Sequence, residues 1–251
     1  MATKAVHLEV ATELTTSAFL EVLQLFIARR GKPSAIYSDN GSNFVGANNK
    51  LKDLSSFLKC NQSTLQTELG VNQGINWHFI PAYSPHQGGL WEAGVKSVKH
   101  HLIKIMSNRL LTFETFYTIV SQIEGILNAR PLTPLSSNPN DFNVLTPAHF
   151  LIGRPINSIP YPNVEAVSKT MLSHFEQLEE GKQHFWTRWS REYINELQQR
   201  TKWKTNAASV KEGAMVIIKD DNLPSYKWNL GRCNDTIVNS LTLRTLAKSF
   251  K

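Results

Sequence analysis

Short stretches of the chain alternate between apolar and polar residues, and longer stretches repeat apolar residues at helical spacing. Residues 5–10 (AVHLEV) alternate, which is typical of a half-buried strand. Residues 34–38 and 75–81 are short apolar runs that end in Asp-Asn-Gly and in proline, so we predict two more strands. Helical spacing predicts helices over 18–30, 90–108, 112–129, 146–152 and 171–203, with one or two more within 48–69. This alternation of strands and helices favours an α/β fold.

The C-terminal part of the chain shows strand patterns around a turn. Residues 214–219 and 227–232 are strand-like and flank an Asp-Asn-Leu-Pro segment, which predicts a small β module. The run that follows Arg232 gives no clear pattern.

Composition narrows the class of protein. The chain has 251 residues, of which 41% are hydrophobic and 19% charged, so it can bury a core. No apolar stretch approaches 18 residues and the first ten residues lack a leader pattern, so we expect an intracellular protein without a membrane span. Cys60 and Cys233 lie far apart without metal-binding spacing, and we expect both to be free thiols.

The positive charge is concentrated at one end. The net charge is +7, and residues 181–251 hold 13 basic against 6 acidic residues, which accounts for the whole excess. Basic residues there are interleaved with Trp203 and Trp228. A basic module favours a polyanionic partner because Lys and Arg release the counterions condensed on phosphates. A merely solvated basic face explains the same charge and stays open as an alternative.

Two acidic residues occupy positions from which they could act. Asp39 follows the strand at 34–38, where the carboxyl edge of a sheet presents its ligands, although Asp-Asn-Gly is also an ordinary turn. Glu92 begins the helix at 90–108 and shares a face with Lys96 and Lys99, although such spacing also describes an exposed ion pair. Neither residue by itself indicates catalysis.

The order of these motifs along the chain indicates a protein family more specifically than any single motif does. DNGSNF at 39–44 and PHQGGLWE at 85–92 resemble the catalytic core of integrases of retroviruses and long-terminal-repeat retrotransposons, most closely those of BEL/Pao-type elements. Further similar stretches are LNARPLTPL at 127–135 and LTPAHFLIGRPI at 145–156. The resemblance covers residues 4–47, 77–102, 127–135, 145–156, 185–203 and 210–232.

The resemblance implies a ribonuclease H-like α/β core that lacks its first two strands, then a helical connector and a small, incomplete SH3-like β module. The implied limits are 1–155 for the core, 156–205 for the connector and 206–251 for the basic β domain. In this family three carboxylates hold two Mg²⁺ or Mn²⁺ ions that join a DNA 3′ end to target DNA.

Asp39 matches the second of those carboxylates and Glu92 the third, and 52 residues separate them. Both would therefore be catalytic residues and metal ligands. For contact with DNA we single out six basic residues: Lys96, Lys99, Lys202, Lys204, Lys227 and Arg232.

The first carboxylate of the family pattern is missing. No aspartate precedes Asp39, and AVHLEV matches the third strand of the fold, so Glu9 does not replace it and is expected to face solvent. The family's N-terminal zinc-binding domain is also absent. We therefore expect an N-terminally truncated, catalytically incomplete integrase, which would act in the nucleus if functional.

Two other interpretations stay open. The chain could bind nucleic acid without cutting it, or it could be a structural or oligomerising relic in which Trp186, Trp189 and Trp203 belong to the core. A homo-oligomer is compatible with each. We assign no role to His86, His100 or His101, which we expect to be solvated.

Overall fold

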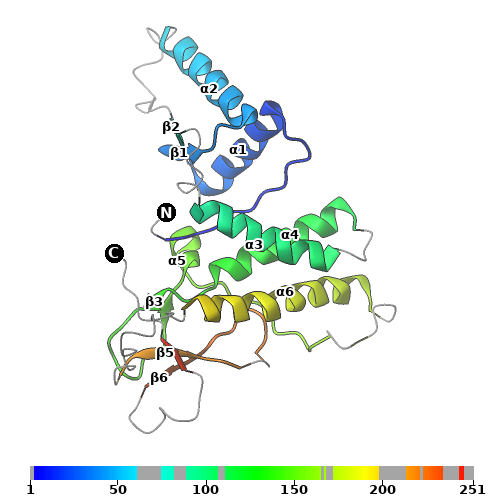
Figure 1. The fold of residues 1–251 in the computed structure, drawn as a ribbon, viewed down its shortest axis with the longest axis vertical. Coiled ribbons are helices and arrows are strands. Elements are labelled where there is room, and N and C mark those ends of the chain that lie inside the picture. The colour runs from blue at the N-terminus through cyan, green and yellow to red at the C-terminus, as the bar shows by residue number, and fades with distance from the viewer. Residues whose placement is uncertain are drawn as a thin grey trace. The chain divides into compact units, whose positions relative to one another are not determined.

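The computed structural model shows a mixed α/β chain (Figure 1). It describes residues 3–60, 75–81, 89–106, 111–164, 167, 172–197, 213–220, 223–233 and 243–245. About half of these residues are helical and the sheets are small. The chain divides into two compact units: Glu9–Ser97, and Met1–Leu8 together with Val98–Lys251. None of the helices in the described ranges is both long enough and apolar enough to cross a membrane.

The unit Glu9–Ser97 follows the predicted order. Helix α1 (Thr16–Arg30) is capped by the Thr15 hydroxyl, which accepts from the Ala18 N–H, and it ends at Gly31. The other elements are β1 (Ala35–Ser38), α2 (Ser42–Cys60), β2 (Asn76–Phe79) and the first part of α3 (Gly89–Met106). The predicted strands at 34–38 and 75–81 and the predicted helix at 90–108 are confirmed. Helix α2 begins six residues earlier than the periodicity indicated, and residues 61–69 lie outside the described ranges.

Strands β1 and β2 pair in parallel, with Tyr37 opposite His78 and Ser38 opposite Phe79. Trp77 packs on the same side of this sheet as the two helices, in contact with Phe19 of α1 and Phe44 of α2. Aromatic packing therefore attaches α1 and α2 to one face of the pair.

Helices α1 and α2 approach each other closely at Gly46. A Cβ there would lie 2.3 Å from the Thr16 hydroxyl oxygen, so only glycine allows this contact.

Helices α3, α4 (Phe113–Asn128) and α6 (His174–Leu197) enclose the core of the other unit. Helix α4 runs beside α6 (Figure 1). The predicted short helix is present as α5 (Pro147–Ile152), with proline in its first turn and Gly153 behind it. The core consists of Val98, Ile105, Ile119, Ile123, Ile126, Leu127, Phe185, Trp186 and Trp189. Trp186 and Trp189 are thus confirmed as core residues, whereas Trp203 lies outside the described residues.

The predicted β module is a three-stranded antiparallel sheet in the order β6-β5-β7. Strands β5 (Met215–Ile218) and β6 (Asn229–Arg232) confirm the expected pair. Strand β7 (Leu243–Thr245) lies in the run after Arg232, for which no element was predicted. A second small sheet, β3 (Thr133–Pro134) with β4 (Val144–Leu145), was not predicted. Cys233 is a buried free thiol, as expected, whereas the side chain of Cys60 is outside the described part.

Aromatic side chains join this module to the carboxyl end of α4. The Tyr226 hydroxyl donates to the Gln122 carbonyl at 2.8 Å, and the Trp228 indole donates to the Ala129 carbonyl at 3.1 Å. A Cβ on Gly125 would lie 2.7 Å from the Tyr226 hydroxyl oxygen, so glycine makes room for that side chain. Burial raises the pKa of Tyr226 well above its ordinary value, which keeps the hydroxyl protonated as a donor.

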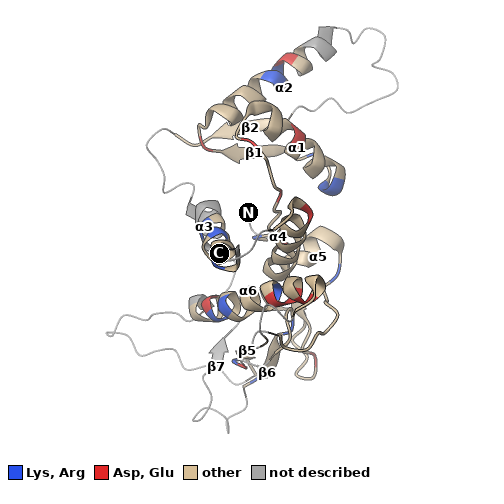
Figure 2. Cartoon of the chain, turned by 90° about the vertical axis from the view of Figure 1, so that its right-hand side faces the viewer, with Lys and Arg blue, Asp and Glu red and all other residues tan. Residues whose placement is uncertain are grey.

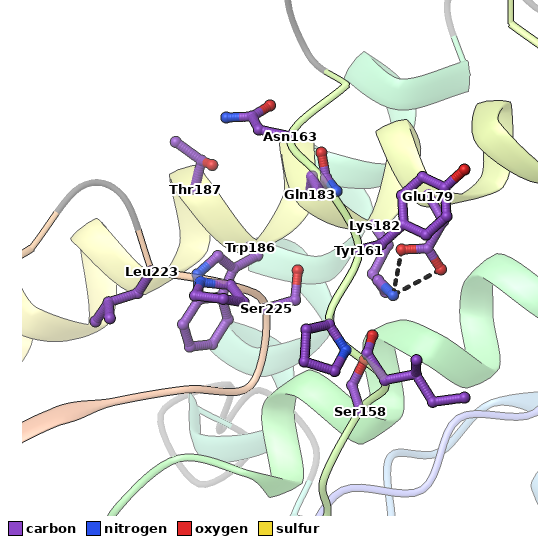
Figure 3. Close-up of a pocket in the computed structure, with 13 residues that line it drawn as sticks. Ser158, Tyr161, Asn163, Glu179, Lys182, Gln183, Trp186, Thr187, Leu223 and Ser225 are labelled. Atoms are coloured by element: carbon purple, nitrogen blue, oxygen red, sulfur yellow. Dashed lines mark hydrogen bonds and ion pairs between the residues drawn. The ribbon is translucent and has the colours of Figure 1, made fainter.

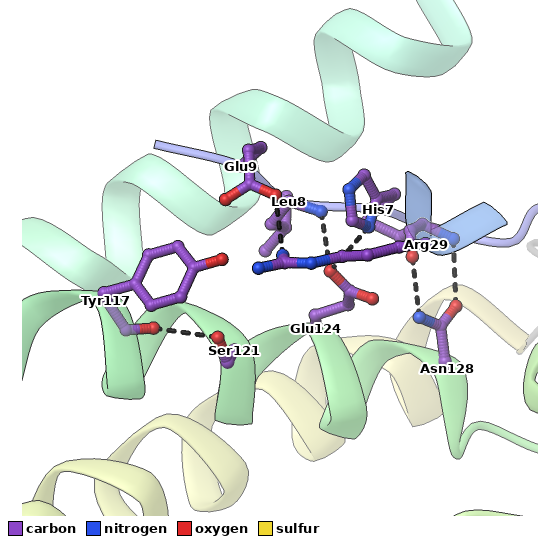
Figure 4. Close-up of polar contacts among 9 residues, drawn as sticks. His7, Leu8, Glu9, Arg29, Tyr117, Ser121, Glu124 and Asn128 are labelled. Atoms are coloured by element: carbon purple, nitrogen blue, oxygen red, sulfur yellow. Dashed lines mark hydrogen bonds and ion pairs between the residues drawn. The ribbon is translucent and has the colours of Figure 1, made fainter. Parts of the chain in front are cut away.

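The predicted strand at 5–10 is wrong. These residues have no strand partner, and side chains of α4 bind their backbone instead (Figure 4). The Asn128 amide accepts from the Val6 N–H at 2.9 Å and donates to the Val6 carbonyl at 2.7 Å, and Glu124 accepts from the Leu8 N–H at 2.8 Å. The amide of Asn128 therefore supplies the donor and the acceptor that a neighbouring strand would have offered.

The expectation that Glu9 faces solvent is also wrong. Its side chain is 4% exposed and forms an ion pair with Arg29 of α1 at 2.8 Å. The ion pair between Glu9 and Arg29 therefore has a structural role within the unit Glu9–Ser97.

Replacement of Asn128, which is fully buried, tests this substitute for strand pairing. We expect Asn128→Ala to lower the free energy of unfolding by about 2 kcal/mol, because it removes two hydrogen bonds to Val6 worth about 1 kcal/mol each. Ser121→Ala, on the exposed side of α4, is the matched control and should stay within about 0.5 kcal/mol. Urea unfolding followed by tryptophan fluorescence measures both, and equal stability of the two variants would contradict the assignment.

Candidate functional site

Asp39 lies directly after β1 with an exposed side chain, at the carboxyl end of the parallel pair. Its Oδ1 accepts from the Gly41 N–H at 2.9 Å, which closes a tight turn. Asn40 donates to the Ile80 carbonyl at 2.8 Å and so ties this turn to the end of β2. The Gly41 carbonyl then accepts from Phe44 and begins α2. The predicted turn and the predicted presentation of a carboxylate are thus both present at this position.

The other predicted carboxylate, Glu92, belongs to the first turn of α3, and its side chain lies outside the described residues. Carboxylate oxygens such as those of Asp39 are the ligands that Mg²⁺ prefers. Within the described ranges, however, no three His, Cys, Asp or Glu side chains lie close enough to hold a metal ion. Asp39 alone fits as one ligand, so the two-carboxylate metal site stays a prediction and we derive no catalytic step from it.

A basic face runs along α3 (Figure 2). Lys96, Lys99 and Lys104 are exposed and are the charged residues among those α3 side chains that the structure describes. Lys104 donates to the His100 ring at 2.7 Å. Val98 and Ile105, on the opposite face, are buried in the core. Lys96 and Lys99 therefore have the exposure that contact with phosphates requires, and their DNA role stays a prediction.

Arg232 is held by the protein itself. Its guanidinium donates to the backbone carbonyls of Gly213, Ser136, Asn138 and Asp141 at 2.7 to 3.2 Å. The bonds to Ser136, Asn138 and Asp141 join strand β6 to the loop between β3 and β4, and the bond to Gly213 joins it to the residues just before β5. The geometry favours a structural role over the predicted DNA contact, because both terminal nitrogens of the guanidinium already donate to backbone carbonyls.

The other C-terminal candidates differ in what can be said of them. Lys227 is exposed in the turn before β6 and is available to solvent. Lys202 and Lys204 lie outside the described residues.

A cavity of about 100 Å³ lies between α6, residues 158–163 and residues 223–225 (Figure 3). Its polar wall holds an ion pair between Glu179 and Lys182 at 2.5 Å, and both side chains are 7% exposed. Gln183 donates to the Pro162 carbonyl and accepts from the Val164 N–H. Lys182 and Gln183 thus have partners within the protein, and we interpret the cavity as a packing gap between α6 and the segments that cross it.

Sequence reasoning missed two polar sites. His101 was expected to be solvated but is 1% exposed, and its Nε2 lies 2.9 Å from the Glu192 carboxylate of α6. The available signal was its spacing from Val98 and Ile105, which puts it on the apolar face of α3. His100 is exposed as expected, and His86 lies outside the described part.

The second missed site is in the LNARPLTPL segment. Arg130 donates to the Leu127 carbonyl at the end of α4 and to the Lys4 carbonyl, while Tyr193 donates to the Pro131 carbonyl at 2.6 Å. This segment therefore connects α4, α6 and the N-terminal residues.

Comparison with protein families matches residues 173–250 to a family of unknown function, DUF5641. The match begins just before α6 and extends past β7, so it takes in the helix and the sheet that pack together in the structure. It covers about a third of the chain. No curated protein matches the sequence.

Substitutions can separate the structural role of Arg232 from a contribution of its positive charge to DNA binding. We expect Arg232→Lys to lower the free energy of unfolding by about 1 to 2 kcal/mol, because an ammonium cannot reach the same carbonyls, while affinity for duplex DNA stays the same. The reverse is expected of Lys227→Ala, with unchanged stability and weaker DNA binding. Thermal melts and fluorescence anisotropy measure the two effects. Unchanged stability in Arg232→Lys, with lower DNA affinity in Arg232→Ala, would instead assign this residue to DNA.

Proposed function

We propose that the chain is a DNA-binding protein of the retrotransposon integrase type, with a ribonuclease H-like core, and that it does not by itself join DNA strands. The observation that carries this proposal is the exposed carboxylate of Asp39 at the carboxyl end of a parallel strand pair. Strand β2 of this pair leads through Pro81 to α3, which bears Glu92 and the exposed lysines. This arrangement agrees with the order of elements that the resemblance implies.

Charge supports DNA as the partner. The excess of basic residues lies in 181–251, and a further basic face lies on α3. Lysines that neutralise phosphates supply a sequence-independent affinity, and they bind most strongly at low salt. The proposed binding surface therefore includes Lys96, Lys99 and Lys227, with Lys202 and Lys204 as further candidates.

The number of acidic residues limits the chemistry. Two metal ions about 3.5 to 4 Å apart activate the attacking oxygen and stabilise the leaving one in phosphoryl transfer, and they need a carboxylate that bridges them. Asp39 and Glu92 match two of the three acids of the family, and no other aspartate precedes Asp39 in this sequence. In this proposal the chain binds DNA, and its set of carboxylate ligands for divalent cations is incomplete.

The catalytic part of the proposal predicts an absence of reaction. With Mg²⁺ or Mn²⁺ and a labelled duplex oligonucleotide, the chain should show no 3′ processing and no strand transfer above the background of an Asp39→Asn, Glu92→Gln double variant. Gel analysis of the labelled strands measures both reactions. Activity that the double variant abolishes would show that these two acids suffice, and the claim of incompleteness would then be wrong.

The binding part predicts a salt-dependent affinity for duplex DNA. The logarithm of the association constant should fall linearly with the logarithm of salt concentration, and Lys96→Glu with Lys99→Glu should lower affinity at least tenfold and flatten that slope by about two. The matched control changes the same charge on exposed residues of α2, Lys50→Glu with Lys52→Glu, and should lower affinity much less. Equal losses in the two double variants, or affinity that does not change with salt, would contradict the proposal.

A further inference from the structure

Two aromatic rings lie stacked and exposed on one face of the β1–β2 pair. Tyr37 and His78 are directly opposite in the parallel register. Their ring centroids are 4.7 Å apart and the rings are 16° from parallel. Tyr37 is 59% exposed, and His78 is also exposed.

This face differs from the other face of the same two strands. Trp77 alternates with His78 along β2, and it packs against α1 and α2 through Phe19 and Phe44. The helices thus cover one side, while the side that carries Tyr37 and His78 presents its rings to solvent. A stacked aromatic pair with an open outer face is the geometry on which unpaired nucleobases stack in single-strand recognition.

The position of the pair links it to the candidate site. Tyr37 lies in β1, and Asp39 follows that strand one residue after its end, in the turn that leads to α2. A base that stacks on the Tyr37 ring would therefore lie two residues along the chain from the exposed carboxylate.

We propose that Tyr37 and His78 form a stacking platform for one unpaired nucleobase at the end of a DNA strand. This proposal rests on the proposed function, and it adds the part of the substrate that is recognised near Asp39. The base stacks on the aromatic pair while its backbone passes Asp39. Stacking does not discriminate strongly among bases, since each has a π-face, so the platform positions a strand end without reading a long sequence.

The test uses the full chain and a single-stranded 12-nucleotide DNA with 2-aminopurine at its 3′ end. Fluorescence of 2-aminopurine is quenched when the base stacks. We expect quenching on binding to the wild-type chain, loss of quenching with about tenfold weaker binding in Tyr37→Ala, and retention of both in Tyr37→Phe. Because Tyr37 is exposed, the alanine variant should keep its fold, which circular dichroism verifies.

Tyr117→Ala is the matched control. Tyr117 stacks on Phe113 of α4 with an interplanar angle of 15°, so the control also breaks an aromatic pair, and quenching should be unchanged. Unquenched wild type, or equal quenching in the wild-type chain and in Tyr37→Ala, would each overturn the platform.

Binding of plain duplex DNA, measured with the same variants, separates the two proposals. Retained duplex binding without quenching rejects the platform alone, whereas absence of duplex binding at every salt concentration rejects the proposed function.

Discussion

At the carboxyl end of α4, backbone carbonyl groups have no intrahelical N–H to accept from, and side chains, two of them from distant parts of the chain, supply the missing donors. Arg130 donates to Leu127, Trp228 to Ala129 and Tyr193 to Pro131. The last two donors come from the β module and from α6. Because a buried carbonyl without a partner is costly, these bonds fix where α6 and the β module pack, and the aromatic rings bury the surface between them.

The same helix end also holds the N-terminal residues. Asn128 binds both backbone groups of Val6, and Arg130 donates to the Lys4 carbonyl. A sequence that alternates like a strand is thereby kept extended without a strand beside it. Here the side-chain amide of Asn128 and the guanidinium of Arg130 pair with the backbone groups of these residues. Each side chain replaces a neighbouring strand over only one or two residues.

Two groups of basic residues among those that the structure describes differ in their partners. Arg130 and Arg232 are joined to backbone carbonyls and hold loops and helix ends together. Lys96, Lys99 and Lys227 are exposed. Net charge gives no indication of this division, because an arginine that ties a loop and a lysine that meets a phosphate contribute equally to it. A planar guanidinium can reach several carbonyls at once, which suits Arg130 and Arg232 to these positions.

Local patterns in the sequence determined much of the secondary structure. The caps and stops of α1 and α5, the turn at Asp39 and the strands β1 and β2 follow from side chains within a few residues of each other, and all were predictable. The exposure of Asp39 also followed, since a carboxylate after a strand lies at the sheet edge.

Only the tertiary structure decided the positions whose state depends on distant partners. Residues 5–10 are not a strand because their neighbours are the side chains of α4, and His101 is buried because α6 covers it. Arg232 is committed to carbonyls about ninety residues away in sequence. The stacked pair of Tyr37 and His78 exists because the parallel register sets two residues 41 positions apart face to face. Periodicity and motif spacing act over one or two turns of chain, whereas these contacts form only after the whole backbone has folded.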